Sequence, residues 1–131
     1  MACVSSDILA GTAPGHLLGR NGPVAAILSL DGHPLVMPRR HVPALDGLDE
    51  AEAASLMPMA VRIARALRAA TGCAGVNLVL SDGAAAGQDV DHLHLHVKPR
   101  WPGDGVALEW NTATRPDEER ARLADALRAP L

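Results

Sequence analysis

The sequence predicts an α+β fold: a mostly antiparallel, five-stranded sheet with one long helix and a short C-terminal helix. Three observations support this prediction. Turn-forming dipeptides join neighbouring apolar segments as hairpins, one long segment has helical periodicity, and the segments follow in the order β-β-β-α-β-β-α. No repeat or linker divides the 131 residues, so we expect residues 1–131 to form a single domain.

The first three strands are expected before the long helix. Asn21-Gly22 separates residues 16–20 from residues 23–30, and this dipeptide favours the left-handed turn of a tight hairpin. Asp31-Gly32 predicts a second hairpin turn, between that strand and residues 33–37. Two hairpins in succession place the three strands antiparallel to one another.

The long helix has clear start and stop signals. Asp49 with Glu52 three residues later forms a capping box, and Gly72 is a typical C-terminal cap. Pro58 is expected to kink the helix or to shorten it to a start near residue 57. Apolar residues recur every three or four positions and predict one face toward a core: Leu56, Ala60, Ile63, Leu67 and Ala70.

The last two strands flank a polar, glycine-rich loop. Residues 75–80 are predicted as one strand, and residues 90–98 alternate between polar and apolar side chains and predict the other. The C-terminal helix is expected over residues 117–128, with Leu123 and Leu127 on one face.

Composition limits the classes of partner. The net charge of −3 offers no basic surface for nucleic acid, and no apolar stretch is long enough to cross a membrane. The first residues carry no signal-peptide pattern, and two cysteines are too few for a disulfide framework, so we expect a cytoplasmic protein. With two Trp and no Phe or Tyr, a second copy would help to cover apolar surface, which favours a homodimer.

The most informative segment contains three of the six histidines, His92, His94 and His96. Alternate side chains of a strand project from the same face, about 6.6 Å apart, so the three imidazoles are expected to form a row. A polar surface, a metal site and a nucleophilic imidazole acting on phosphorus are three explanations of such a row. The preceding Gly87-Gln88 favours the third, because a glycine-rich turn and an amide both offer donors to an anion.

Residues 86–101, AGQDVDHLHLHVKPRW, resemble the signature of the histidine-triad (HIT) superfamily. Residues 32–42, GHPLVMPRRHV, are similar to the upstream Gly-His segment of that family. The resemblance covers most of residues 8–128. The end of the signature is most similar to the branch of dinucleoside-polyphosphate hydrolases of the fragile-histidine-triad type and related bacterial proteins.

This resemblance implies an activity and a set of site residues. A P–O or P–N bond of a nucleoside-phosphate conjugate, most often of adenosine type, would be cleaved through a covalent nucleotidyl-His94. His96 would contact the phosphate or the leaving group, and His92 would orient the other two. No cofactor is implied, and the family commonly forms homodimers. The implied substrate-binding residues are Ile27, Leu28, Ser29, His33, Ser81, Gly87, Gln88 and Asp89.

The sequence also departs from the family pattern. Ser6 follows Cys3 where some members have a second zinc-binding cysteine, so we expect no metal at this position. The turn 29–33 is several residues shorter than in relatives, Ser81 replaces an amide, and Asp89 places a carboxylate beside the expected phosphate. These differences leave open an alternative, a nucleotide-binding regulator with little turnover.

Overall fold

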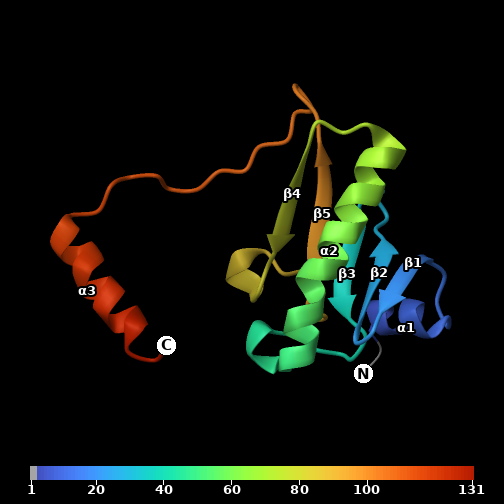
Figure 1. The fold of residues 1–131 in the computed structure, drawn as a ribbon, viewed down its shortest axis with the longest axis horizontal. Coiled ribbons are helices and arrows are strands. Elements are labelled where there is room, and N and C mark those ends of the chain that lie inside the picture. The colour runs from blue at the N-terminus through green and yellow to red at the C-terminus, as the bar shows by residue number, and fades with distance from the viewer. Residues whose placement is uncertain (1–2) are drawn as a thin grey trace.

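One antiparallel sheet of five strands forms the centre of the structure, a computed structural model that describes residues 3–131. The strand order across the sheet is β1-β2-β3-β5-β4, which confirms the predicted fold class. Helix α2 (Glu50–Thr71) lies across one face and contacts β2, β3 and β5 (Figure 1). The strands are β1 (His16–Asn21), β2 (Val24–Leu28), β3 (Pro34–Pro38), β4 (Gly75–Leu80) and β5 (Leu95–Arg100).

Both predicted hairpins are present, with one shift in position. Asn21 pairs with Val24, so the first turn consists of Gly22 and Pro23 rather than Asn21 and Gly22. Gly22 has a φ of 58°, a left-handed conformation that favours glycine. The second turn closes where the Ser29 N–H donates to the carbonyl oxygen of His33 at 2.9 Å, which places the turn at the end of β2.

Helix α2 begins at the predicted capping box. The Asp49 side chain accepts from the Glu52 N–H, and the Glu52 side chain accepts from the Asp49 N–H. Pro58 lies inside the helix, so the expectation of a shortened helix is wrong: the capped first turn supplies enough bonds to start the helix earlier. The core beneath α2 consists of buried aliphatic side chains, among them Val24, Ala26, Val36, Leu56, Met59, Ala60, Leu67, Leu95 and Val97.

A short helix that the sequence patterns did not indicate, α1 (Val4–Ala10), covers part of the other face of the sheet. Its Leu9 packs with Ala25, Ile27 and Met37 in a second apolar cluster. With seven residues, α1 is too short for a reliable helical period, and its contacts with the sheet stabilise it.

Strand β5 begins later than predicted. The alternating pattern predicted a strand over residues 90–98, but β5 spans Leu95–Arg100 and pairs with β3 only at Leu95 and His96. The Leu93 N–H instead donates to the carbonyl oxygen of Val42 at 2.7 Å, outside the strand ladder. His92 and His94 therefore precede the strand, and the period of two does not govern their side chains.

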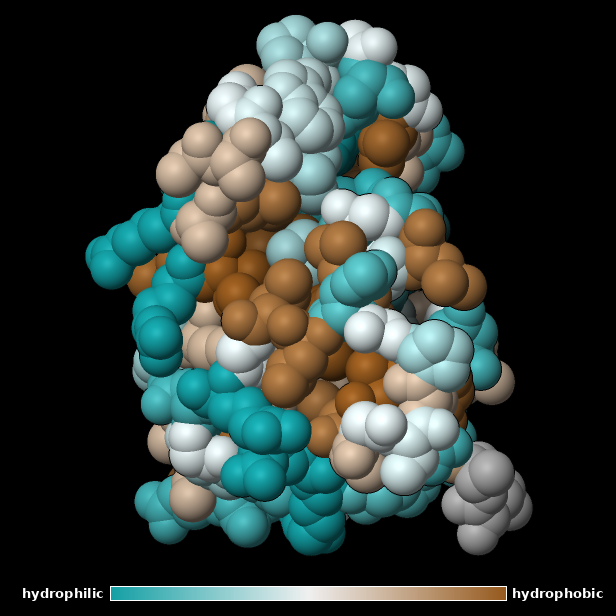
Figure 2. Space-filling model, turned by 90° about the vertical axis from the view of Figure 1, so that its right-hand side faces the viewer, coloured by the Kyte–Doolittle hydropathy of each residue, from teal (hydrophilic) through white to brown (hydrophobic). Residues whose placement is uncertain are grey.

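Helix α3 (Asp117–Arg128) forms where it was predicted, apart from the sheet at the end of an extended segment (Figure 1). Its Leu123 and Leu127 are 53% and 57% exposed. On another side of the molecule, apolar side chains gather on the face toward β1 (Figure 2), and Leu17 and Leu18 of this edge strand are also exposed. None of the helices within residues 3–131 combines the length and apolar character that a membrane span requires.

Candidate active site

The side chain arrangement around His94 suits a nucleophile. His94 is 8% exposed, and its Nδ1 lies 2.7 Å from the carbonyl oxygen of His92. A carbonyl oxygen only accepts hydrogen bonds, so Nδ1 carries the proton of the neutral ring and Nε2 keeps its lone pair. The backbone of the preceding histidine thus sets the tautomer in which Nε2 can attack an electrophile.

His96 and His33 complete a group of three imidazoles. The His94 and His96 rings lie 4.8 Å apart, edge to face, and the His96 and His33 rings lie 5.0 Å apart. Nε2 of His33 is 2.7 Å from Nδ1 of His96. Burial lowers the pKa of both His33 and His96, because the charged form loses hydration.

His92 makes its contacts elsewhere, so the expected row of three rings is wrong. Its side chain is fully buried and donates from Nε2 to the carbonyl oxygen of Pro38 at 2.8 Å. Nδ1 faces the side chains of Cys3 and Ser6, both at 3.4 Å, at the start of α1. Burial lowers the pKa of His92. The physical reason is the late start of β5, which leaves residue 92 in irregular backbone.

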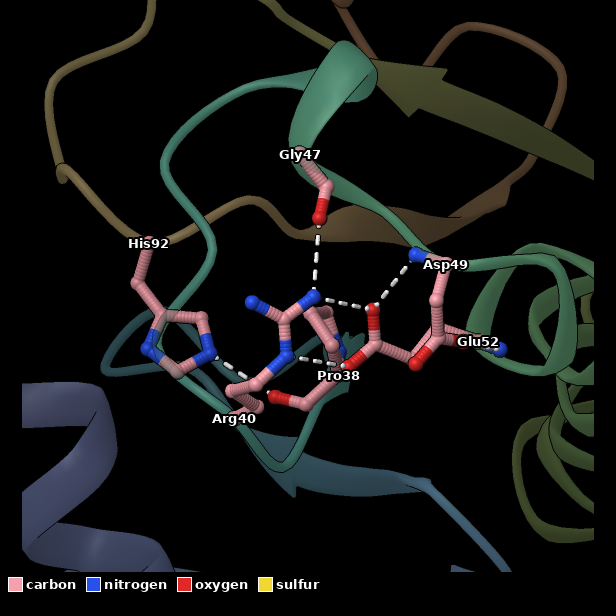
Figure 3. Close-up of polar contacts among 6 residues, drawn as sticks. All are labelled: Pro38, Arg40, Gly47, Asp49, Glu52 and His92. Carbon is pink, nitrogen blue, oxygen red and sulfur yellow. Dashed lines mark hydrogen bonds and ion pairs between the residues drawn. The ribbon is translucent and has the colours of Figure 1, made fainter.

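An ion pair anchors the segment that holds His92 (Figure 3). Arg40 binds both carboxylate oxygens of Glu52 at 2.9 and 2.8 Å, and it also donates to the carbonyl oxygen of Gly47 at 2.8 Å. Glu52 is 2% exposed, and the hydrogen bonds from Arg40 lower the pKa of its carboxyl group. The start of α2 is thereby tied to the chain beside Pro38, whose carbonyl holds His92. The sequence patterns identified Glu52 only as a cap.

The glycine-rich loop is held by the side chain of Gln88. Its Oε1 accepts from the Gly83 N–H at 2.8 Å, and its Nε2 donates to the carbonyl oxygens of Pro43 and Val90 at 2.8 and 3.1 Å. Both amide hydrogens are thus engaged in this conformation. Gly87 has a φ of 91°, which favours glycine, and both Gly87 and Asp89 are exposed.

Ile27, Leu28 and Ser29, expected on the nucleoside side, and Ser81, expected beside the phosphate, lie in different environments. Ile27 is 3% exposed and packs in the cluster beneath α1, whereas Leu28 is half-buried at the end of β2. The Ser29 hydroxyl lies in the tight turn and contacts Asp31 and His33. Ser81 follows β4 and is half-buried.

Three side chains could hold a metal ion. Their ligand atoms, in Cys3, His41 and His92, all lie within 4.8 Å of one another. Since Nε2 of His92 donates to Pro38, Nδ1 is the ring nitrogen left to bind a metal. A thiolate and two imidazoles suit zinc, but a closed structural site uses four protein ligands, and the fourth side chain here is the hydroxyl of Ser6. The set offers three protein ligands, one fewer than a closed structural zinc site, and the expectation of no metal here stays a prediction.

Comparisons with known proteins agree with this architecture. A family model described as HIT domain matches residues 11–103. A HIT-like protein of Mycobacterium tuberculosis is 36% identical, with 100% of this chain and 94% of that protein covered. An adenylylsulfatase of Arabidopsis thaliana is 29% identical, with 98% of this chain and 69% of that protein covered.

Solved structures show the same fold. The crystal structure of a HIT family member from Bacillus subtilis has a TM-score of 0.91 at 28% identity, covering 100% of this chain and 98% of that one. A zinc-bound histidine triad family protein from Mycobacterium smegmatis is 34% identical with a TM-score of 0.75, and 98% of each chain is covered. The family model spans more than half of the chain, and the identity to the M. tuberculosis protein extends over all of it. The protein therefore belongs to the histidine-triad (HIT) family.

Proposed function

We propose that the protein is a nucleotidyl hydrolase or transferase that cleaves a P–O or P–N bond of a nucleotide conjugate through a covalent nucleotidyl-His94. The observation that carries this proposal is the 2.7 Å contact from Nδ1 of His94 to the carbonyl oxygen of His92, which leaves the lone pair on Nε2. A buried imidazole in this tautomer is a nucleophile at neutral pH, and it is also a good leaving group once it carries phosphorus.

The reaction would proceed in two displacements. Nε2 of His94 attacks phosphorus, the bond to the leaving group breaks, and the leaving group takes a proton from Nε2 of His96. A water molecule then attacks the nucleotidyl-histidine, the N–P bond breaks, and the water proton goes to Nε2 of His96. One imidazole thus serves as acid and then as base, and the enzyme returns to its starting protonation state.

Substrate contacts would come from both ends of the site. Gln88 shapes the loop through its bonds to Gly83, Pro43 and Val90, and the exposed Gly87 would lie beside the phosphate. Ser81 and Asp89 are proposed beside the phosphate, with Asp89 disfavouring highly charged substrates. On the nucleoside side we propose Ile27, Leu28, Ser29 and His33. An adenosine-type conjugate is supported by the similarity to a protein described as an adenylylsulfatase.

A single domain of residues 1–131 and a homodimer belong to this proposal. The exposed Leu123 and Leu127 of α3 would pack on a second copy, because two leucines on one face of an isolated helix gain from burial. We further propose a cytoplasmic location, with no nucleic acid or membrane as partner. If zinc binds, Cys3, His41 and His92 would hold it, and it would brace α1 against His92.

The test is hydrolysis of adenosine phosphoramidate and of diadenosine polyphosphates by the wild type and by His94→Ala. We expect turnover by the wild type and its loss in His94→Ala, together with a trapped adenylyl group on His94 detected by mass spectrometry. His16→Ala, at an exposed histidine of β1, is the matched control and should keep its activity. Equal turnover with and without His94 would refute the assignment.

The regulator alternative is favoured by one structural observation, the tight turn 29–33, which leaves few residues for contacts with a ribose. Tight AMP binding in calorimetry, with no turnover of any conjugate by the wild type, would support this alternative in place of catalysis.

A further inference from the structure

An ion-pair contact and a hydrogen bond in series connect the tight turn to His96. Oδ1 of Asp31 lies 2.8 Å from Nδ1 of His33, and Nε2 of His33 lies 2.7 Å from Nδ1 of His96. The register of the sheet brings His33 and His96 together, because His33 directly precedes β3 and Leu35 of β3 pairs with His96 of β5. A carboxylate, an imidazole and a second imidazole thus form a continuous chain that ends at the site.

The chemistry of the carboxylate assigns the protons along this chain. The hydrogen bond from the Ser29 hydroxyl lowers the pKa of Asp31, so its carboxyl group is ionised at neutral pH and can only accept. The Ser29 hydroxyl, 3.2 Å from Nδ1 of His33, already gives its hydrogen to Asp31, so both oxygens near Nδ1 act as acceptors and Nδ1 carries the proton. In the neutral ring Nε2 of His33 then accepts, and Nδ1 of His96 donates to it. The nitrogen of His96 that remains available to a substrate is Nε2.

The position of Asp31 follows from the shortness of the turn. The Ser29 hydroxyl accepts from the His33 N–H at 3.0 Å and donates to Asp31, and Gly32 has a φ of 88°. These contacts hold the Asp31 carboxylate against the imidazole of His33, which lies two positions later in the chain. Lys98 of β5 lies 3.5 Å from the other carboxylate oxygen. The Asp31 side chain is 61% exposed, so solvent weakens the electrostatic effect of its charge on His33. Solvent does not change which atom of the pair donates.

We propose that Asp31 is a positioning residue that fixes the tautomer of His33, and through it orients His96 so that His96 exchanges protons with substrate at Nε2. This inference rests on the proposed function. When His96 is protonated, it donates Nδ1–H to His33 and gives its Nε2 proton to the leaving group. When it is neutral, it keeps Nδ1–H on His33 and takes the proton of water at Nε2. Asp31 stays ionised and His33 keeps its Nδ1 proton throughout.

The groups that face this pair come from four segments: Asp31 in the turn, Lys98 on β5, His94 before β5, and Asp89 in the glycine-rich loop. The charge of Asp31 acts against burial and raises the pKa of both His33 and His96. Removing that charge should reduce the fraction of His96 that carries the proton it donates.

The first test reads the tautomers directly and needs no substrate. The ¹⁵N-labelled wild type is measured at a pH high enough that both imidazole rings are neutral. Imidazole NMR should then show Nδ1 protonated and Nε2 unprotonated in His33 and in His96. Free histidine prefers the opposite tautomer, so this pattern is diagnostic. In Asp31→Asn, His33 should shift to a mixture of tautomers, and Asp31→Glu should restore part of the pattern. A wild-type His33 protonated at Nε2, or spectra unchanged by Asp31→Asn, would overturn the proposal.

The second test uses turnover. General acid–base groups contribute about 100- to 10,000-fold to rate, and for an exposed positioning residue we expect about a tenfold fall in kcat in Asp31→Asn. KM should change by less than about twofold, and the basic limb of the kcat profile should move to lower pH. Asp125→Asn on α3 removes the same charge far from the sheet and should match the wild type. An unchanged kcat in Asp31→Asn, with His94 still essential, would refute the role of Asp31 and leave the proposed function standing. Loss of the His94 requirement would instead refute the proposed function.

Discussion

Leu93 lies between His92 and His94, and its side chain is part of the core. Replacing Leu93 by alanine tests whether packing of this side chain positions the two histidines. Its side chain is fully buried, and its N–H donates to the carbonyl oxygen of Val42 at 2.7 Å. Replacing a buried leucine by alanine lowers the free energy of unfolding by about 3 kcal/mol, because transfer free energy is lost and a cavity is left behind. Leu30, which is fully exposed in the turn after β2, should lose nothing measurable in the same substitution.

Urea denaturation of the two variants and the wild type measures this difference. In thermal unfolding, a loss of about 3 kcal/mol in a domain of this size corresponds to a fall of roughly 10 °C in Tm. We also expect a lower kcat in Leu93→Ala under conditions in which the variant stays folded, because the backbone at His92 that holds Nδ1 of His94 is free to shift. A free-energy loss below about 1 kcal/mol would show that the site relaxes into the space and that Leu93 does not anchor the segment.

Three further predictions follow from the other contacts. The free energy of unfolding should fall as the pH drops below about 6.5, because burial lowers the pKa of His33 and His96 in the folded protein and the unfolded chain therefore takes up protons first. A free energy of unfolding that stays constant between about pH 7.5 and 5.5 would contradict this. Ser6→Cys should bind zinc at least about tenfold more tightly than the wild type in chelator competition, because a second thiolate completes a four-ligand site; equal affinities would exclude this geometry. Deleting residues 117–131 should turn a dimer into a monomer in light scattering, since the exposed apolar face of α3 would be lost; an unchanged mass would remove α3 from the interface.

Elements specified by local sequence were predictable, and those that depend on distant partners were less so. The capping box and Gly72 mark both ends of α2, and the glycine turns mark both hairpins, because each signal acts within a few residues. Helix α1 was missed because its stability comes from packing of Leu9 on the sheet, which no short pattern records.

The candidate site shows the same division. The family resemblance placed His33 near the other histidines, and the structure brings it to 2.7 Å from His96. The partners that distinguish one histidine from another were not visible in the sequence. Asp31 is linked to His96 through His33 only because β3 and β5 pair. Cys3 contacts His92 only because α1 folds beside it.

His92 and His94 show why the alternating pattern alone could not assign their roles. A regular strand would give both side chains the same face and similar partners. Here the backbone before β5 is tied to Val42 through Leu93, outside the ladder, so the two rings are free to differ. One ring is buried against Pro38 and Cys3, and the other uses the carbonyl of its neighbour to expose the lone pair of Nε2. The irregular backbone therefore separates a histidine that braces the site from the one proposed to attack phosphorus.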